Sequence, residues 1–184
     1  MSAGTITWVD METNGLDPHE NVLLEVACLV TDNDLNILDD DGYQAVVRYT
    51  DQQAMRAYQA AVPFVREMHT KTGLWKKLTH GTYLYRIDEE LHDYVARFSE
   101  PRTSPVGGNS LRLDMNFMDR YLPLTAAHLD YHMRDVSTVA GLAKDWYGLP
   151  PFKKVSDHTA MTDIRECVKE LRYYREFFTA EAAL

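Results

Sequence analysis

The pattern of apolar and polar positions predicts that the chain begins with β-strands. Thr5–Val9 alternates and then runs apolar, which is typical of a buried strand. Val22–Thr31 is rich in apolar and β-branched residues and contains a single charge, Glu25, so we expect it to form a central strand. Two further segments should complete an antiparallel meander, namely a short return at Leu35–Leu38 and a strand at Tyr43–Tyr49.

Apolar residues recur at helical spacing through residues 51–99, and strand and helix patterns alternate after that stretch. Pro63 should kink or restart the first helix, because proline fits the first turn of a helix but not its interior. His69–Leu74 is polar and contains a glycine, which favours a connecting loop. The later elements are a strand at Pro105–Gly108, a helix ending near Tyr121, a strand at His128–Asp135, a helix ending at Trp146 and an amphipathic helix from about Asp157 to Phe178.

This order of elements predicts an α/β fold built on one mixed sheet. The meander supplies antiparallel strands and the later strand-helix units supply parallel ones, so we expect five strands, with the first in the centre and helices on the flanks. The 184 residues are 45% hydrophobic and 26% charged, which fits a single globular domain over residues 1–184. Ligands of such sheets bind beyond the carboxyl ends of the strands.

Composition and charge narrow the function. No apolar run approaches the roughly 18 residues of a membrane span, and the N-terminus lacks the blocks of a signal peptide. We therefore expect a cytoplasmic protein without a membrane partner. Cys28 and Cys167 lack CxxC spacing, which favours packed thiols over a disulfide or a zinc site. The 28 acids outnumber the 19 basic residues, giving a net charge of −9, so long duplex nucleic acid is disfavoured as a partner.

Two acids stand where the first strand should end. Asn14-Gly15 is a turn signal, so Asp10 and Glu12 are expected at the carboxyl end of the strand, with both side chains on one face. Like charges so placed repel each other unless a cation lies between them, and oxygen ligands favour Mg²⁺ or Mn²⁺ over zinc. Taken alone, such a pair more often marks a solvated strand end that carries unrelated acids than a metal site.

Other acids should reach the same edge of the sheet. Asp114 lies on the first turn of the helix that follows a later strand, and Asp163 with His158 comes from a helix that can pack across this edge. Four acids and one histidine would then meet without a basic residue. Because so many clustered carboxylates would raise one another's pKa values, the sequence predicts a pair of divalent metal ions among them.

Short motifs occur in a fixed order along nearly the whole chain. They are Trp8–Glu12, Gly15–Asp17, Leu29–Leu38, His69–Leu74, Gly108–Asp114, Asp135–Thr138, Ser156–Glu166 and Glu170–Arg175. In residues and spacing this ordered set resembles the DEDDh 3′-to-5′ exonucleases and, within them, the oligoribonucleases. The resemblance implies an RNase H-like fold and hydrolysis of short RNA, dinucleotides especially, to nucleoside 5′-monophosphates.

The resemblance also implies roles for the five residues that could carry the chemistry. Asp10, Glu12 and Asp163 would hold one of two catalytic Mg²⁺ or Mn²⁺ ions, with Asp10 shared by the second. Asp114 would act through the waters of that second ion. His158 resembles the general base that takes a proton from the attacking water, a task suited to a group that titrates near neutrality.

Substrate contacts and a homodimer are implied in the same way. Leu16 resembles an apolar wedge between two bases, and Tyr131 resembles a residue donated by a second subunit. Other residues resemble contacts with the nucleotides or with the 5′ phosphate: Phe64, His69, Asn109, Ser110, His132, Ser137 and Thr138.

Several positions depart from the family's pattern. Phe64 stands where a Trp is common, His132 stands where an Arg commonly joins the phosphate contacts, and Thr13-Asn14 replaces a usual Met-Thr pair. A histidine cannot form the bidentate phosphate contact of a guanidinium group, so we expect His132 to substitute only in part, and more when protonated. Two alternatives to the exoribonuclease remain open: an exonuclease for longer single strands of RNA or DNA, and a non-catalytic module that binds nucleotides.

Overall fold

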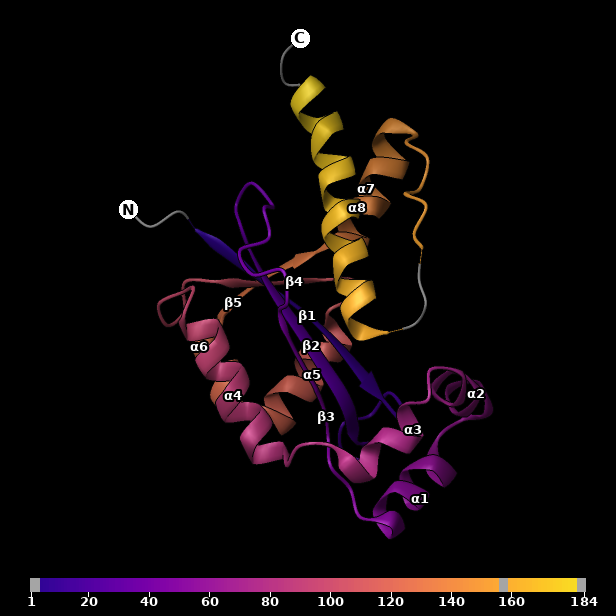
Figure 1. Cartoon of the computed structure of the whole chain (residues 1–184). Helices are drawn as coiled ribbons and strands as arrows, with labels where there is room; N and C mark the ends of the chain where they lie inside the picture. The colour runs from indigo at the N-terminus through magenta and orange to yellow at the C-terminus, as the bar shows by residue number, and fades with distance from the viewer. Residues whose placement is uncertain (1–3, 156–158, 182–184) are drawn as a thin grey trace.

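A computed structural model describes residues 4–155 and 159–181 of the chain, and a five-stranded mixed sheet forms its centre (Figure 1). The strand order is β3-β2-β1-β4-β5, so β1 is central, as predicted. β1 and β2, and β2 and β3, pair antiparallel, whereas β4 pairs parallel with both β1 and β5. The strands are β1 (Thr5–Thr13), β2 (Leu23–Asp32), β3 (Tyr43–Val46), β4 (Pro105–Gly108) and β5 (Asp130–Asp135).

The structure corrects the predicted ends of the meander. Leu35–Leu38 is not a strand, because its pairing is limited to an isolated bridge between Ile37 and Thr31. Leu35 adopts a left-handed backbone with φ of 67°, and the Asp32 carboxylate accepts hydrogen bonds from both the backbone and the side chain of Asn36. These local bonds favour a turn over an extended strand.

Helices account for most of the remaining described chain. They are α1 (Asp51–Ala60), α2 (Pro63–Lys71), α3 (Leu74–Lys77), the 3₁₀-helix η1 (Leu78–His80), α4 (Leu84–Ala96), α5 (Arg112–Tyr121), α6 (Pro123–His128), α7 (Val136–Tyr147) and α8 (Ala160–Glu181). Pro63 begins α2, as expected for a proline at the first helical position. The predicted start of the last helix near Asp157 lies outside the described residues.

Two helical segments were not predicted. His69 is not in a loop but in the last turn of α2, where its ring is completely buried. The helix α6 was not predicted, although it too begins with a proline, and its N-cap residue Leu122 makes no side-chain cap bond. Asp88 on α4 supplies one instead, since its carboxylate accepts the backbone N–H groups of Leu124 and Thr125.

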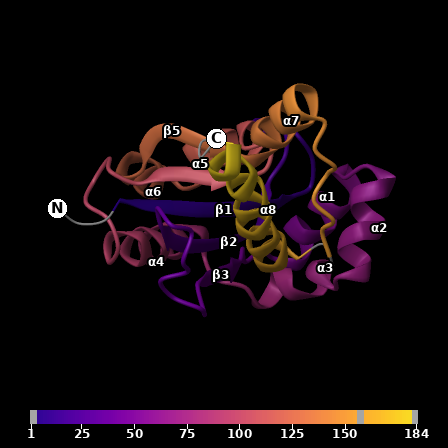
Figure 2. The ribbon, with the colours of Figure 1, turned by 90° about the horizontal axis from the view of Figure 1, so that it is seen from above.

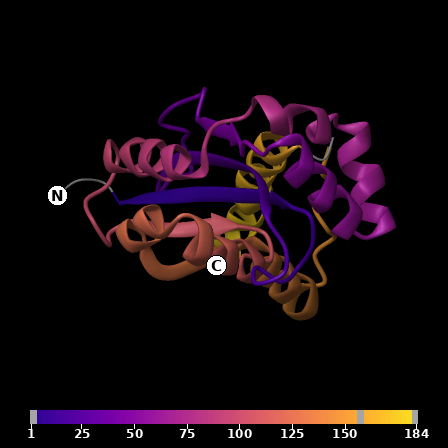
Figure 3. The ribbon, with the colours of Figure 1, turned by 90° about the horizontal axis from the view of Figure 1, so that it is seen from below.

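Helices cover both faces of the sheet (Figures 2 and 3). One face packs against α4, α5 and α6 through a core that includes Val9, Met11 and Phe117. The opposite face packs against α8 through Trp8 and Ile164. The helices α1, α2 and α3 gather beyond the carboxyl end of β1 (Figure 1). Across residues 4–155 and 159–181, no helix is both long and apolar enough to cross a membrane.

Candidate metal centre

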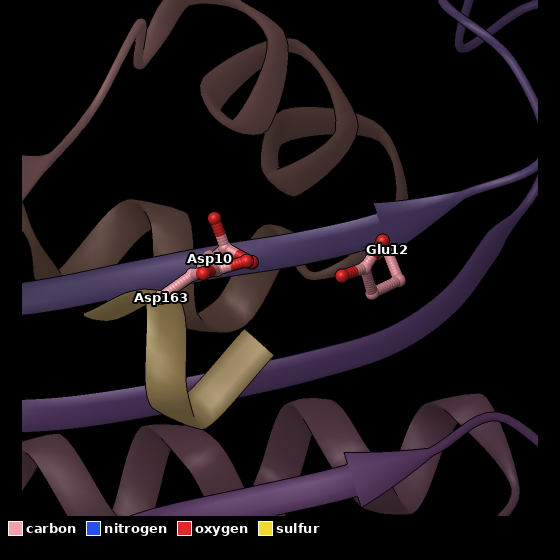
Figure 4. A group of neighbouring side chains, drawn as sticks. All are labelled: Asp10, Glu12 and Asp163. Carbon is pink, nitrogen blue, oxygen red and sulfur yellow. The ribbon is translucent and has the colours of Figure 1, made fainter. Parts of the chain in front are cut away.

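Three carboxylates converge on the face of the sheet that α8 covers. Asp10 and Glu12 lie two residues apart near the end of β1, and Asp163 lies in the first turn of α8. One oxygen of each carboxylate lies within 4.8 Å of an oxygen of each of the others. Figure 4 shows the Asp10 and Asp163 carboxylates meeting beside β1, with Glu12 further along the strand. The structure therefore brings together acids that are more than 150 positions apart in sequence.

Asp114 approaches the same strand from α5. It lies in the first turn of that helix, is 8% exposed, and its Oδ1 accepts the backbone N–H of Met11 at 3.0 Å. The group of three converging carboxylates does not include it. Its charge nevertheless reaches Asp10, because it is the largest electrostatic contribution, after burial, to the raised pKa of that residue. Asp114 is thus the fourth acid at this end of β1.

Burial and mutual repulsion disfavour the ionised acids. Burial is the main cause that raises the pKa of Glu12 to about 8, and neighbouring carboxylates add to it. Burial also raises the pKa of Asp114 to about 7, although the N–H of Met11 opposes this rise. The pKa of Asp10 lies well above its usual range for the same reasons as that of Glu12. A divalent cation would offset this repulsion, and carboxylate oxygens are ligands that Mg²⁺ and Mn²⁺ accept, so the described residues fit such an ion.

His69, on α2, contacts the carboxyl end of β1. Its Nε2 lies 3.1 Å from the carbonyl oxygen of Thr13 and 3.8 Å from Oε2 of Glu12, and its ring packs edge-on against Trp75. Burial lowers the pKa of the imidazole, which favours the neutral form that donates from Nε2 to Thr13. His69 was expected to line the nucleotide pocket, yet its side chain has no exposed surface in this structure.

Two of the predicted nucleotide contacts are prominently exposed. Leu16, in the loop after β1, is 78% exposed, and Phe64, in the first turn of α2, is 72% exposed. Both therefore remain available for contacts with bases, as the resemblance implied. His158, the predicted general base, lies outside the described residues, so its role stays a prediction.

Three of the predicted substrate contacts lie at the starts of two helices. The hydroxyl groups of Ser110, which precedes α5, and Ser137, at the start of α7, lie 3.2 Å apart. Thr138 lies beside them, and its backbone N–H donates to Asp135, which is the N-cap of α7. The amide of Asn109 points elsewhere, because its Nδ2 donates to Oε2 of Glu170 on α8 at 3.2 Å.

The last two predicted contacts lie on β5, which is an edge strand. Tyr131 is 79% exposed, and its ring centroid lies 3.9 Å from that of His132. Nδ1 of His132 lies 2.6 Å from the carboxylate of Asp130, and the hydrogen bonds from His132 lower the pKa of that acid. Tyr131 is therefore exposed at the rim of the sheet, where a second molecule can reach it.

One buried acid at the centre was missed. Glu25 pairs with Glu12 across β1 and β2, is 5% exposed, and accepts a hydrogen bond from Gln44 on β3. Its charge is the largest electrostatic contribution, after burial, to the raised pKa of Glu12. A lone charge in an otherwise apolar strand was the available signal, but the strand register that sets it opposite Glu12 was not apparent from the sequence.

Comparison with known proteins identifies the family. The profile of the RNase_T exonuclease family matches residues 7–171. The oligoribonuclease of Streptomyces coelicolor is 39% identical over 175 residues, which cover 93% of this chain and 85% of the relative. The human protein named "Oligoribonuclease, mitochondrial" is 36% identical over 178 residues, covering 94% of this chain and 73% of the relative.

Solved structures show the same fold at lower identity. Exonuclease I of Methylocaldum szegediense superposes with a TM-score of 0.69 at 18% identity, covering 94% of this chain. The chain spans 40% of the length of that protein, and the likeness confirms the RNase H-like fold that the motifs implied. With a matched profile, ordered motifs and oligoribonuclease relatives along most of its length, the chain belongs to the RNase_T exonuclease family and, within it, to the oligoribonucleases.

Proposed function

We propose that this protein is a 3′-to-5′ exoribonuclease that hydrolyses short RNA, dinucleotides especially, and releases nucleoside 5′-monophosphates. The observation that carries the proposal is the convergence of Asp10, Glu12 and Asp163 within 4.8 Å on one face of the sheet. Membership in an exonuclease family supports phosphodiester hydrolysis that depends on divalent metal ions. The names of the relatives support short RNA as the substrate.

We assign two Mg²⁺ or Mn²⁺ ions to the centre. Asp10, Glu12 and Asp163 would hold one, Asp10 would be shared with the second, and Asp114 would bind waters of the second. When bound, two such ions stabilise the charge on the attacking and leaving oxygens of a phosphodiester. The acids must lose their protons to serve as ligands, and the pKa of about 8 at Glu12 means that metal binding will release protons near neutral pH.

The remaining residues would bind and orient the substrate. Leu16 would separate the two bases, while Ser137 and Thr138 would bind the 5′ phosphate at the start of α7, where a helix N-terminus attracts anions. His158 would take the proton of the attacking water. Tyr131, exposed on the edge strand β5, would be contributed by the second subunit of a homodimer.

A length series of 5′-phosphorylated RNA, assayed with and without chelator, tests this function. The expected result is that kcat/KM is highest for the dinucleotide, falls as the strand lengthens, and vanishes with chelator. Equal rates on the dinucleotide and on a long strand would instead support the exonuclease for longer strands.

The cytoplasmic location stays a prediction, since the human relative is named mitochondrial.

A further inference from the structure

A buried acid on α8 lies far from the candidate metal centre but on the same side of the helix. Glu170 follows Asp163 by seven residues, which is two helical turns or about 10 Å along the axis. Its side chain is 7% exposed. Glutamate is rarely buried unless it is paired, so the contacts of Glu170 indicate what keeps it there.

Two donors from different parts of the fold meet at this carboxylate. Oε2 of Glu170 accepts Nδ2 of Asn109 at 3.2 Å and lies 2.7 Å from Nζ of Lys154. Asn109 directly follows β4 and precedes α5, the helix that carries Asp114. Lys154 belongs to the segment between α7 and α8. Glu170 therefore joins three segments, two of which carry acids of the candidate metal centre.

The side-chain orientation of Asn109 that allows the contact with Glu170 leaves another of its polar atoms without a partner. Oδ1 of Asn109 is buried and accepts no hydrogen bond from the described residues. A buried acceptor without a partner costs about 1–3 kcal/mol, so the amide would turn elsewhere unless the charged acceptor at Glu170 held it.

Such a link acts on the helix that carries Asp163, in addition to the apolar packing of α8 against β1 and β2. The Asp163 carboxylate approaches that of Asp10, and when both are ionised without a cation, their repulsion opposes this placement of Asp163. On another side of α8, Arg165 and Arg172 donate to the carbonyl oxygens of Asp40 and Leu35, which holds the helix toward the segment between β2 and β3. Glu170 supplies the corresponding link toward β4.

We propose that Glu170 is a positioning residue, which fixes α8 to the end of β4 and thereby sets the place of Asp163 in the metal centre. The inference rests on the proposed function, because it assumes that Asp163 binds metal. Glu170 would act through the position of Asp163 rather than by binding metal or substrate itself. Its loss should weaken metal binding through displacement of Asp163, and excess metal should compensate.

Glu166 offers a matched control on the same helix. It is also buried, at 4% exposure, and it accepts the N–H of Val155 at 3.0 Å and pairs with Lys169 at 2.7 Å. These partners lie on α8 and on the segment before it, not on β4. Glu166→Gln thus removes a comparable charge without touching the link to β4.

The test is to titrate the metal-free protein with Mn²⁺ alone and to measure the binding by isothermal titration calorimetry. We expect Glu170→Ala to weaken Mn²⁺ binding by about tenfold, as seen for residues that orient metal ligands, and Glu170→Gln to weaken it less, because its amide oxygen still accepts from Asn109. Glu166→Gln should stay within about twofold of the wild type. In steady-state assays, saturating Mn²⁺ should restore most of the kcat of Glu170→Ala.

A double-mutant cycle separates positioning from general destabilisation. Asn109→Ala combined with Glu170→Ala should bind Mn²⁺ no more weakly than Glu170→Ala alone, because both changes break one link. Equal losses in Glu170→Ala and Glu166→Gln, or wild-type affinity in Glu170→Ala, would overturn the inference while leaving the proposed function intact. A wild-type protein that binds no Mn²⁺ would overturn both. If Glu170→Ala does not fold, Glu170→Gln and Asn109→Ala decide the question in the same assay.

Discussion

Replacing Glu12 by Gln should stabilise the metal-free protein at alkaline pH. The pKa of Glu12 is raised from 4.5 to about 8, chiefly by burial. A raised carboxyl pKa means that the protonated side chain stabilises the fold below pH 4.5 and that this contribution is lost as pH rises through 8. With 1.36 kcal/mol for each tenfold change in proton affinity, the ionised form costs at most roughly 5 kcal/mol.

The measurable gain will be smaller than this limit, because Asp10 and Asp114 keep more protons when Glu12 ionises and water relaxes around the charge. We expect Glu12→Gln to be about 2 kcal/mol more stable than the wild type at pH 9, since single substitutions rarely change stability by more than about 4 kcal/mol. Near pH 5 the two proteins should be about equally stable.

Urea unfolding followed by far-UV circular dichroism, in chelator at both pH values, measures this difference. Glu89→Gln serves as the control, because Glu89 is an exposed acid on α4. The stability of this variant should match that of the wild type at both pH values. Adding Mn²⁺ at pH 9 should stabilise the wild type more than Glu12→Gln. A difference between Glu12→Gln and wild type that does not change with pH would refute the reasoning.

Other substitutions test single roles. Asp163→Asn should abolish hydrolysis, measured by release of mononucleotides, while circular dichroism in chelator shows an intact fold, because losing one charge relieves repulsion at Asp10. His158→Ala should lower kcat by roughly 10²-fold or more if it is the general base, and an unchanged rate would assign it a structural role. His132→Arg should lower KM for a 5′-phosphorylated dinucleotide severalfold with little change in kcat, because a guanidinium group can contact the phosphate through two hydrogen bonds; an unaltered KM would remove His132 from the phosphate site.

The sequence predicted the parts of the fold that local pattern determines. The apolar run of β1 and the turn after it located Asp10 and Glu12 correctly at the end of a central strand. Pro63 separated α1 from α2, because proline favours the first position of a helix, an effect that acts within a single helical turn. The acids of the candidate metal centre were thus accessible from sequence, because strand ends and helix starts are local features.

What the sequence could not show depends on partners far along the chain. Asp88 caps a helix that begins 35 positions later, and Glu25 faces Glu12 only through the register of two strands. His69 looked like a residue of a polar loop, yet its ring is buried against the carbonyl of Thr13. In each case a tertiary contact, rather than local propensity, decides where the side chain lies.

We propose above all that acids from β1 and α8 form one binding site for divalent metal. Crystals grown with Mn²⁺ and measured for anomalous scattering test it most directly. We predict two peaks, one bound by Asp10, Glu12 and Asp163 and the other next to Asp10 on the side of Asp114, at the short metal-oxygen distances of carboxylate ligands. Strong Mn²⁺ peaks elsewhere on the protein, with none among these acids, would contradict the account.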